Sequence, residues 1–293
     1  MSFCRSVLVF CAALIISFLT LLPGNILSFF SRFMAYSYKW YARKESKQLH
    51  ENIHKILRLP EHSSFARDFA NQVIYHQFMS SFESLKAIWS DQKIRIDGVE
   101  EYRRVLSSAI DKGNGLIIVT AHIGSWELLS KVSGECLRPR KLTVLAKPAR
   151  QKFVTILLDR LRAKSGIGVL WLGSKSLMKD MLKTLSAKDA LGFVMDQKPQ
   201  GRVGTPVDFY GHRAEFVRGP AQIACKSSVP VVAAFCLRIA PMHYKVVFYD
   251  VLEGYSSDQE AILTKTLVQS MEKIVRMYPE QWCWNYKRWK FFD

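Results

Sequence analysis

The chain has 293 residues, 49% of them apolar, so it can bury a sizeable core and is not a disordered protein. Its 42 lysines and arginines outnumber its 25 aspartates and glutamates, which gives a formal net charge of +17. Such a surface attracts anions, and charge alone does not choose among nucleic acid, phospholipid and an acidic protein. The six cysteines form no CxxC pair and have no metal-ligand spacing, so we interpret them as reduced core or membrane residues.

An uncharged apolar run covers residues 7–22 and stops at Pro23-Gly24-Asn25. As a helix it rises about 24 Å, slightly less than the roughly 30 Å hydrocarbon core of a bilayer. We predict an uncleaved membrane anchor over residues 1–25, with local thinning of the bilayer or flanking aromatic residues covering the difference. A secretory signal peptide and a buried core helix are the alternative interpretations.

Residues 26–60 interleave aromatic and basic side chains, a composition that suits the headgroup layer of a membrane. We predict an interfacial segment here, and the positive-inside bias then places the rest of the chain in the cytoplasm. Binding of nucleic acid would use the same side chains but would leave the preceding apolar run unexplained. The residues concerned are Arg32, Lys39, Arg43, Lys44, Lys47, Lys55 and Arg58 with Phe33, Tyr36, Tyr38, Trp40 and Tyr41.

Residues 61–293 read as one globular domain in which helical and strand patterns alternate. We predict an α/β fold with a mixed sheet flanked by helices, behind an N-terminal membrane-anchor helix. The expected helices cover 62–90 (one helix or a pair), 99–112, about 125–134, 150–164, 175–187 and 257–277. The expected strands cover 115–121, 142–146, 168–172 and 190–195, followed by a hairpin of 231–238 and 244–251.

Polar side chains follow two of these strands, where ligands gather in open α/β sheets. His122 ends the strand that begins at Gly115, and Glu127 falls on the first turn of the next helix. Asp196 and Gln197 end a second strand, before a loop rich in glycine and proline. The sequence therefore predicts an active-site crevice at this edge of the sheet.

His122 and Glu127 have the spacing of a general base and the carboxylate that orients it. Ser125 lies between them, but the chain has no GxSxG nucleophile elbow, so a covalent acyl-enzyme is poorly supported. We expect the base to activate the hydroxyl of an acceptor substrate directly. A core histidine bonded to a helix-capping glutamate is the alternative interpretation.

The segment His122-Ile123-Gly124-Ser125-Trp126-Glu127 resembles the signature of the late acyltransferases of bacterial lipid A biosynthesis, within the lysophospholipid acyltransferase superfamily. Further blocks agree with that family in order and distance, over nearly the whole chain. They are Lys147-Pro148, Arg160 with Arg162, Asp196-Gln197, Phe209-Tyr210-Gly211, Gly219, Val229-Pro230-Val231-Val232 and the tail Pro279-Glu280-Gln281-Trp282-Cys283-Trp284 with Lys287-Arg288-Trp289-Lys290.

The resemblance implies a glycerolipid acyltransferase-like fold and an O-acyltransferase at the cytoplasmic side of the bacterial inner membrane. Its acyl donor would be an acyl carrier protein and its acceptor an anionic glycolipid, a lipid A precursor; no metal or organic cofactor is expected. Nucleic acid is not an expected partner. On the family's pattern His122 and Glu127 would be catalytic. The expected substrate-binding residues are Lys147, Arg160, Arg162, Asp196, Gln197 and Arg218.

Two departures from the family pattern concern the acceptor. Lys147 stands where the family tends to carry arginine, which gives up bidentate phosphate recognition. Residues 214–218 replace a stretch that is often small and rich in threonine. Another glycolipid or a lysophospholipid, such as a phosphatidylinositol mannoside, is therefore an alternative acceptor. A non-catalytic basic membrane protein that binds nucleic acid or anionic lipid is the alternative from a different class.

Overall fold

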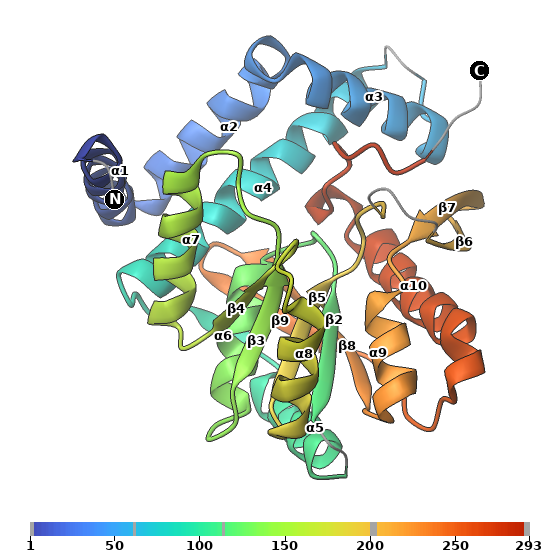
Figure 1. The fold of residues 1–293 in the computed structure, drawn as a ribbon. Coiled ribbons are helices and arrows are strands. Elements are labelled where there is room, and N and C mark those ends of the chain that lie inside the picture. Colours follow the sequence, from blue (N-terminus) through green and yellow to red (C-terminus); the bar gives the residue numbers. More distant parts are fainter. Residues whose placement is uncertain (1–2, 61–62, 113–114, 200–203, 290–293) are drawn as a thin grey trace.

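The computed structural model describes residues 3–60, 63–112, 115–199 and 204–289, and it shows an α/β fold built on one mixed sheet (Figure 1). The seven strands lie in the order β1-β9-β8-β2-β5-β3-β4, and only the β8–β9 pair is antiparallel. The predicted mixed sheet and its hairpin are confirmed. The strands are β1 (Arg95–Asp97), β2 (Leu116–Thr120), β3 (Leu142–Ala146), β4 (Gly168–Trp171), β5 (Ala190–Val194), β8 (Val231–Ala240) and β9 (His243–Phe248).

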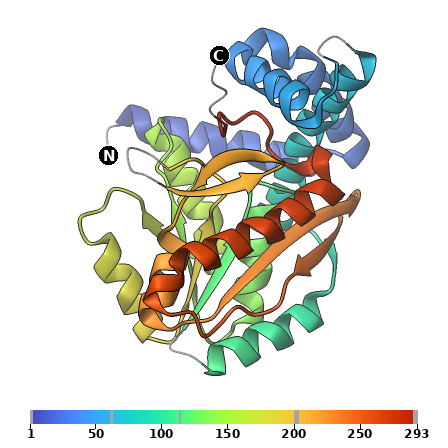
Figure 2. The same ribbon diagram turned by 90° about the vertical axis from the view of Figure 1, so that its right-hand side faces the viewer.

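Helices cover both faces of the sheet, which explains why its central strands are apolar throughout (Figures 1 and 2). In β2, Ile117 and Val119 join the core on one face, whereas Leu116 and Ile118 join the core on the other. This alternation is the two-residue period of a strand. One face is covered by α5 (Val99–Lys112), α6 (Trp126–Cys136) and α7 (Lys152–Lys164); the other by α8 (Leu177–Ser186), α9 (Gly219–Ser227) and α10 (Glu260–Met277).

The N-terminal part of the chain is helical. It forms α1 (Phe3–Leu21), α2 (Gly24–Tyr41), α3 (Arg43–Leu57) and the long α4 (Ser64–Trp89). The segment from 62 to 90 was predicted as one helix or a pair, and it is one helix. Within the described residues, no single helix combines the length and hydropathy of a membrane span; α1 and α2 meet that test only as a pair bent by 117°. The predicted membrane span therefore stays a prediction.

The end of α1 is bonded to the end of α4. Lys86 Nζ donates to the carbonyl oxygens of Thr20 (3.0 Å) and Leu22 (2.6 Å), and Gln92 Nε2 donates to the same Thr20 oxygen (2.8 Å). The last carbonyls of a helix have no partners within it, so these donors cap α1. Burial lowers the pKa of Lys86, and the nearby negative charge of Glu83 opposes this effect only in part. The C-terminal end of α1 is thus held to α4 by polar contacts.

A small hairpin follows the loop after β5, in a segment to which we assigned no strand from the sequence. Strands β6 (Thr205–Phe209) and β7 (His212–Phe216) pair antiparallel and are joined by the two residues Tyr210 and Gly211. Both have positive φ angles, 57° and 74°, as two-residue hairpin turns with right-handed twist require. The signal for the turn was present, but the short strands contain Pro206 and charged residues and show no strong apolar alternation.

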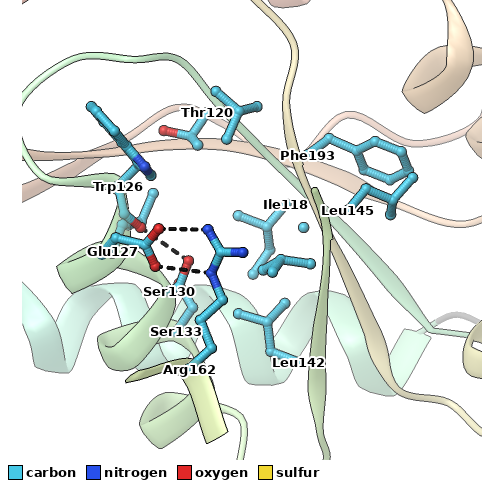
Figure 3. A pocket seen from close by; sticks show the side chains of 14 residues that line it. Ile118, Thr120, Trp126, Glu127, Ser130, Ser133, Leu142, Leu145, Arg162 and Phe193 are labelled. Carbon is cyan, nitrogen blue, oxygen red and sulfur yellow. Dashed lines mark hydrogen bonds and ion pairs between the residues drawn. The ribbon is translucent and has the colours of Figure 1, made fainter. Parts of the chain in front are cut away.

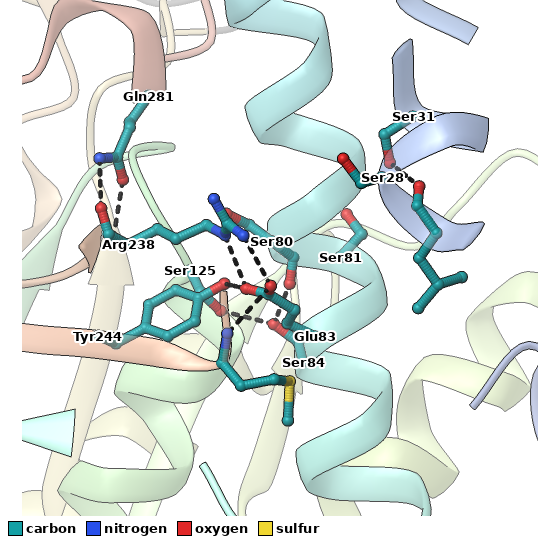
Figure 4. Close-up of polar contacts among 12 residues, drawn as sticks. Ser28, Ser31, Ser80, Ser81, Glu83, Ser84, Ser125, Arg238, Tyr244 and Gln281 are labelled. Atoms are coloured by element: carbon teal, nitrogen blue, oxygen red, sulfur yellow. Dashed lines mark hydrogen bonds and ion pairs between the residues drawn. The ribbon is translucent and has the colours of Figure 1, made fainter. Parts of the chain in front are cut away.

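A buried ion pair joins α4 to the β8–β9 hairpin (Figure 4). Arg238 on β8 donates two hydrogen bonds, of 2.8 and 2.9 Å, to the carboxylate of Glu83 on α4. Tyr244 Oη donates to the same carboxylate at 2.7 Å. The exposed fractions of the Glu83 and Arg238 side chains are 2% and 7%, so the charges depend on each other rather than on solvent.

We therefore expect Glu83→Ala to lower the free energy of unfolding by about 3–5 kcal/mol, because it leaves the Arg238 charge buried and unpaired. The measurement is urea unfolding of the detergent-solubilised protein, followed by tryptophan fluorescence. Glu51→Ala is the matched control, since Glu51 pairs with Lys47 at 3.8 Å on the exposed surface of α3; it should change the free energy by less than about 1 kcal/mol. Equal losses in the two variants would contradict the role of the buried pair.

Candidate active site

His122 lies just past the carboxyl end of β2, beside the end of β5. Thr120 pairs with Val194 in the β2–β5 ladder, so His122 and Asp196 both stand two residues beyond paired positions. The backbone N–H of His122 donates to Asp196 Oδ2 at 3.0 Å, and its carbonyl accepts from the N–H of Cys283 at 2.9 Å. Hydrogen bonds to Asp196 and Cys283 therefore hold the main chain of His122, independently of its ring.

A tight turn takes the chain from β2 into α6. Gly124 has a φ of +57°, and a Cβ placed on it would lie 2.2 Å from the carbonyl oxygen of Cys236 on β8. Ser125 then caps α6, accepting a hydrogen bond from the N–H of Leu128 at 3.2 Å. The Ser125 hydroxyl also bonds to the hydroxyl of Ser84 on α4 at 2.6 Å (Figure 4). These contacts fix where the residues on either side of the turn can point.

The imidazole of His122 is hydrogen-bonded to Asp196. The distance from Nδ1 to Asp196 Oδ1 is 2.6 Å, and Asp196 Oδ2 accepts a further hydrogen bond of 2.9 Å from Trp282 Nε1. Burial alone would raise the pKa of Asp196, but the charge and hydrogen bond of His122, the charge of Arg288 and the Trp282 N–H together lower it well below its usual range. Asp196 is therefore an anion in the folded protein.

An ionised Asp196 fixes the tautomer of His122. The ring donates its Nδ1–H to the carboxylate, which leaves the Nε2 lone pair on the opposite edge. That edge faces the Gln197 amide, with 3.4 Å between the two Nε2 atoms. The rings of Trp126 and Tyr286 flank the imidazole, at 4.9 and 5.4 Å between centroids. The side chain of His122 is 15% exposed, so part of it reaches the surface of the site. The arrangement is that of a general base with an orienting carboxylate.

The contact predicted between His122 and Glu127 is wrong. Glu127 bonds instead to the guanidinium of Arg162 on α7, through Arg162 Nη2–Oε1 at 2.6 Å and Nε–Oε2 at 3.2 Å (Figure 3). The reason is the Gly124 turn: Ser125 starts the helix so that the first-turn carboxylate faces α7. The carboxylate that meets His122 comes from 74 residues further along the chain.

Two cavities border the segment from Gly124 to Glu127, and Trp126 and Glu127 line both. One, of about 250 Å³, lies between α4, the start of α6 and α7. The other, of about 40 Å³, lies against β2, β3 and β5 and contains the Glu127–Arg162 pair (Figure 3). His122 lines neither of them. Among the described residues, no group of three or more His, Cys, Asp or Glu side chains could hold a metal ion.

Comparison with known families identifies the kind of protein in which this arrangement occurs. The family model for bacterial lipid A biosynthesis acyltransferases matches residues 1–291. The chain belongs to that family. No curated protein matches the chain. Membership in the lipid A biosynthesis acyltransferase family indicates that the protein is an acyltransferase, in agreement with the resemblance seen in the sequence.

The structure brings together only part of the site predicted for this family member. His122, Asp196 and Gln197 form one cluster, and Glu127 with Arg162 forms a second pair next to Trp126. The three remaining predicted residues are exposed. Lys147 follows β3 at the same edge of the sheet, Arg160 lies on α7, and Arg218 forms an ion pair with Glu260 at 3.0 Å.

The tail from residue 279 to 289 contributes three residues to which we assigned no role from the sequence. Trp282 bonds to Asp196, Tyr286 packs against His122, and Arg288 Nη2 lies 3.9 Å from Asp196 Oδ2. Asn52 on α3 holds this tail by donating to the carbonyls of Trp284 (2.6 Å) and Tyr286 (2.8 Å). The aromatic-basic composition of the tail was visible in the sequence, but nothing in it indicated that the tail returns to His122.

We expect Gly124→Ala to destabilise the lipid A acyltransferase fold and to remove most of its activity, because the Cys236 carbonyl and the positive φ both oppose a Cβ. Gly166→Ala is the matched control, since Gly166 also has a positive φ (+73°) but nothing lies within 4 Å of its Cβ position. Its cost should be limited to the left-handed strain of about 1–2 kcal/mol. Thermal unfolding of both variants measures the difference; equal midpoints would contradict the close approach at Gly124.

Proposed function

We propose that the protein transfers a fatty acyl chain from an acyl carrier protein thioester to a hydroxyl of a lipid A precursor, with His122 as the general base. The observation that carries this proposal is the His122–Asp196 hydrogen bond of 2.6 Å, which engages Nδ1 and leaves Nε2, on the opposite edge of the ring, to accept a proton. Family membership supplies the reaction class. The acyl carrier protein as donor, the glycolipid as acceptor and His122 as base are parts of the proposal.

In this mechanism the acceptor hydroxyl displaces the Gln197 amide from His122 Nε2 and gives up its proton there. The hydroxyl oxygen attacks the thioester carbonyl carbon, and the resulting tetrahedral intermediate collapses by breaking the carbon–sulfur bond. The leaving thiolate takes the proton from His122, so the products are an ester and a thiol. Asp196 stabilises the imidazolium between the two proton transfers, because it is already an anion.

Glu127 acts through Arg162 in this proposal, not through His122. Their two hydrogen bonds tie the first turn of α6 to α7, next to Trp126, which flanks the His122 ring. The pair is largely buried, with 16% and 12% of the side chains exposed, so removing either partner leaves a charge that the surroundings cannot solvate. Glu127 is then a positioning residue.

Charge favours both proposed substrates. A phosphorylated glycolipid and an acidic carrier protein are anions, and the chain carries a net charge of +17. Lys147 and Arg160 are exposed and free to approach acceptor phosphates, whereas Arg218 would first have to leave Glu260. No metal or organic cofactor has a part in these steps.

The exposed faces of α1 and α2 suit the cytoplasmic surface of the inner membrane, where the acceptor lipid would lie. Large apolar side chains point outward from both helices, next to the basic residues Arg32 and Lys39. Apolar, aromatic and cationic groups together match the boundary between acyl chains and anionic headgroups. The exposed apolar residues are Leu8, Phe10, Leu14, Ile15, Phe18, Leu21, Ile26, Phe29, Phe30, Phe33, Tyr36, Trp40 and Tyr41.

Replacing His122 by alanine should lower the rate of acyl transfer about 10²- to 10⁴-fold, the range that general-base catalysis contributes. The assay follows a radiolabelled acyl chain from the carrier thioester to the lipid A precursor, in detergent. Sedimentation with membranes should be unchanged, because His122 follows β2 and is not one of the exposed apolar residues of α1 and α2. A His122→Ala variant that keeps more than about a tenth of the rate would exclude this base.

Asp196→Asn and Glu127→Gln distinguish the two carboxylates. A neutral amide at position 196 cannot stabilise the imidazolium, so the acidic limb of the rate–pH profile should move to lower pH and the maximal rate should fall. Glu127→Gln should leave the limb in place, whatever it does to stability, because the carboxylate bonds to Arg162. A limb that moves in the Glu127 variant and stays in the Asp196 variant would restore Glu127 as the partner of His122.

A further inference from the structure

Two hydrogen-bond donors that neighbour His122, Gln197 and Tyr286, have no part in its action as a base. Gln197 presents its amide to Nε2 at 3.4 Å, and Tyr286 packs its ring 5.4 Å from the imidazole, tilted by 47°. The Tyr286 hydroxyl is in turn hydrogen-bonded by the Gln197 side chain. Gln197 follows β5, and Tyr286 belongs to the C-terminal tail, so the two donors reach His122 from separate parts of the fold.

Acyl transfer needs such donors. When the acceptor oxygen attacks, the thioester carbonyl oxygen gains a negative charge, and donors held at that position contribute about 10²- to 10³-fold each to the rate. Neither member of the His122–Asp196 pair can supply them. Nε2 accepts the proton of the acceptor, and Asp196 is an anion. A basic side chain is not required either, since oxyanion holes are commonly built from neutral N–H and O–H groups.

We propose that the Gln197 amide and the Tyr286 hydroxyl together bind the thioester carbonyl oxygen and form the oxyanion hole of this enzyme. The inference rests on the proposed function. It assigns both residues to the acyl donor, whereas the sequence suggested only substrate binding for Gln197 and nothing for Tyr286.

The Gln197 contact is arranged so that substrate can replace it. A hydrogen bond of 3.4 Å between two nitrogen atoms is long and weak. An acceptor hydroxyl that binds Nε2 therefore displaces the amide at small cost and leaves its N–H free, about one hydrogen-bond length from the base. Gln197 directly follows Asp196, which is fixed by Trp282 and His122, so the amide stays close to the reacting atoms.

Tyr286 is held in place and stays protonated. Asn52, itself buried in α3, donates to the Tyr286 carbonyl at 2.8 Å, which anchors the main chain beneath the ring. Tyr286 is 40% exposed, so the residue lies partly at the surface beside His122. Partial burial of the hydroxyl raises the pKa of Tyr286 to about 12, so the hydroxyl keeps its proton at neutral pH and remains a donor.

The charge balance of the step is complete with these groups. As the carbon–oxygen bond forms, the carbonyl π electrons move to the carbonyl oxygen. The Gln197 N–H and the Tyr286 O–H donate hydrogen bonds to the resulting oxyanion. When the carbon–sulfur bond breaks, the same electrons re-form the carbonyl and the thiolate leaves with the proton held on His122. Gln197 and Tyr286 lose no proton at any stage, so neither group needs to be reset.

Tyr286→Phe is the first test, because it removes one oxygen atom and keeps the ring beside His122. We expect the kcat for acyl transfer to fall about 10²- to 10³-fold, with little change in the KM for either substrate. Tyr210→Phe is the matched control: Tyr210 packs against Trp284, and its buried hydroxyl has no partner among the described side chains. This variant should transfer at the wild-type rate. A Tyr286→Phe rate within threefold of wild type, or a loss confined to KM, would overturn the proposal.

Gln197→Ala provides a second, independent readout should Tyr286→Phe fail to fold. Its kcat should fall by a similar factor, while the acidic limb of the rate–pH profile stays where wild type has it, because the His122–Asp196 pair is intact. An unchanged kcat overturns the proposal. A wild-type protein that transfers no acyl chain refutes the proposed function itself, whereas an active wild type with an inactive His122→Ala variant and a normal Tyr286→Phe variant refutes only the oxyanion hole.

Discussion

One buried carboxylate organises the candidate active site at the carboxyl ends of β2 and β5. Asp196 accepts hydrogen bonds from the His122 ring, the His122 main chain and the Trp282 indole, and Arg288 stands behind it. A carboxylate with 2% of its side chain exposed is stable as an anion only when such donors and charges compensate the lost water. Asp196 therefore links the ends of β2 and β5, which the strand ladder already places side by side, to the C-terminal tail, and its hydrogen bond orients His122.

The sequence was sufficient to predict the helices and strands whose apolar residues have a strong period. It was insufficient to predict which of these elements pack against one another. Strands β2, β3 and β5 and helices α5, α7 and α10 were predicted close to their observed bounds, because two-residue and 3.6-residue periods are local signals. The helices α2 and α3 were not predicted, since their aromatic and basic side chains were read as an interfacial composition. Strand β1, with three residues, is too short to leave a periodic signal.

The same dependence on local signals explains which residues of the candidate site were predicted from the sequence. His122 was found because a polar residue at the end of an apolar strand is a local feature. Its partner was misassigned because Glu127 is near in sequence, whereas Asp196 is brought near by the β2–β5 register, Thr120 opposite Val194. The order of strands in a sheet cannot be read from a single sequence. Had the β2–β5 pairing been known, the contact between His122 and Asp196 would have followed from it. The separation of Glu127 from His122 depends on the conformation at Gly124, which only the structure reveals.

The hydrogen bonds from Asn52 to the C-terminal tail have a consequence for folding during synthesis on the ribosome. The ring that flanks His122 comes from position 286, and its anchor comes from α3 near the start of the chain. The surroundings of His122 thus cannot be complete until residue 286 has been synthesised and α3 has taken its place. A nascent chain in which α3 is not yet in place would carry His122 without these surroundings, and any activity that depends on them would begin only after Asn52 and Tyr286 have met.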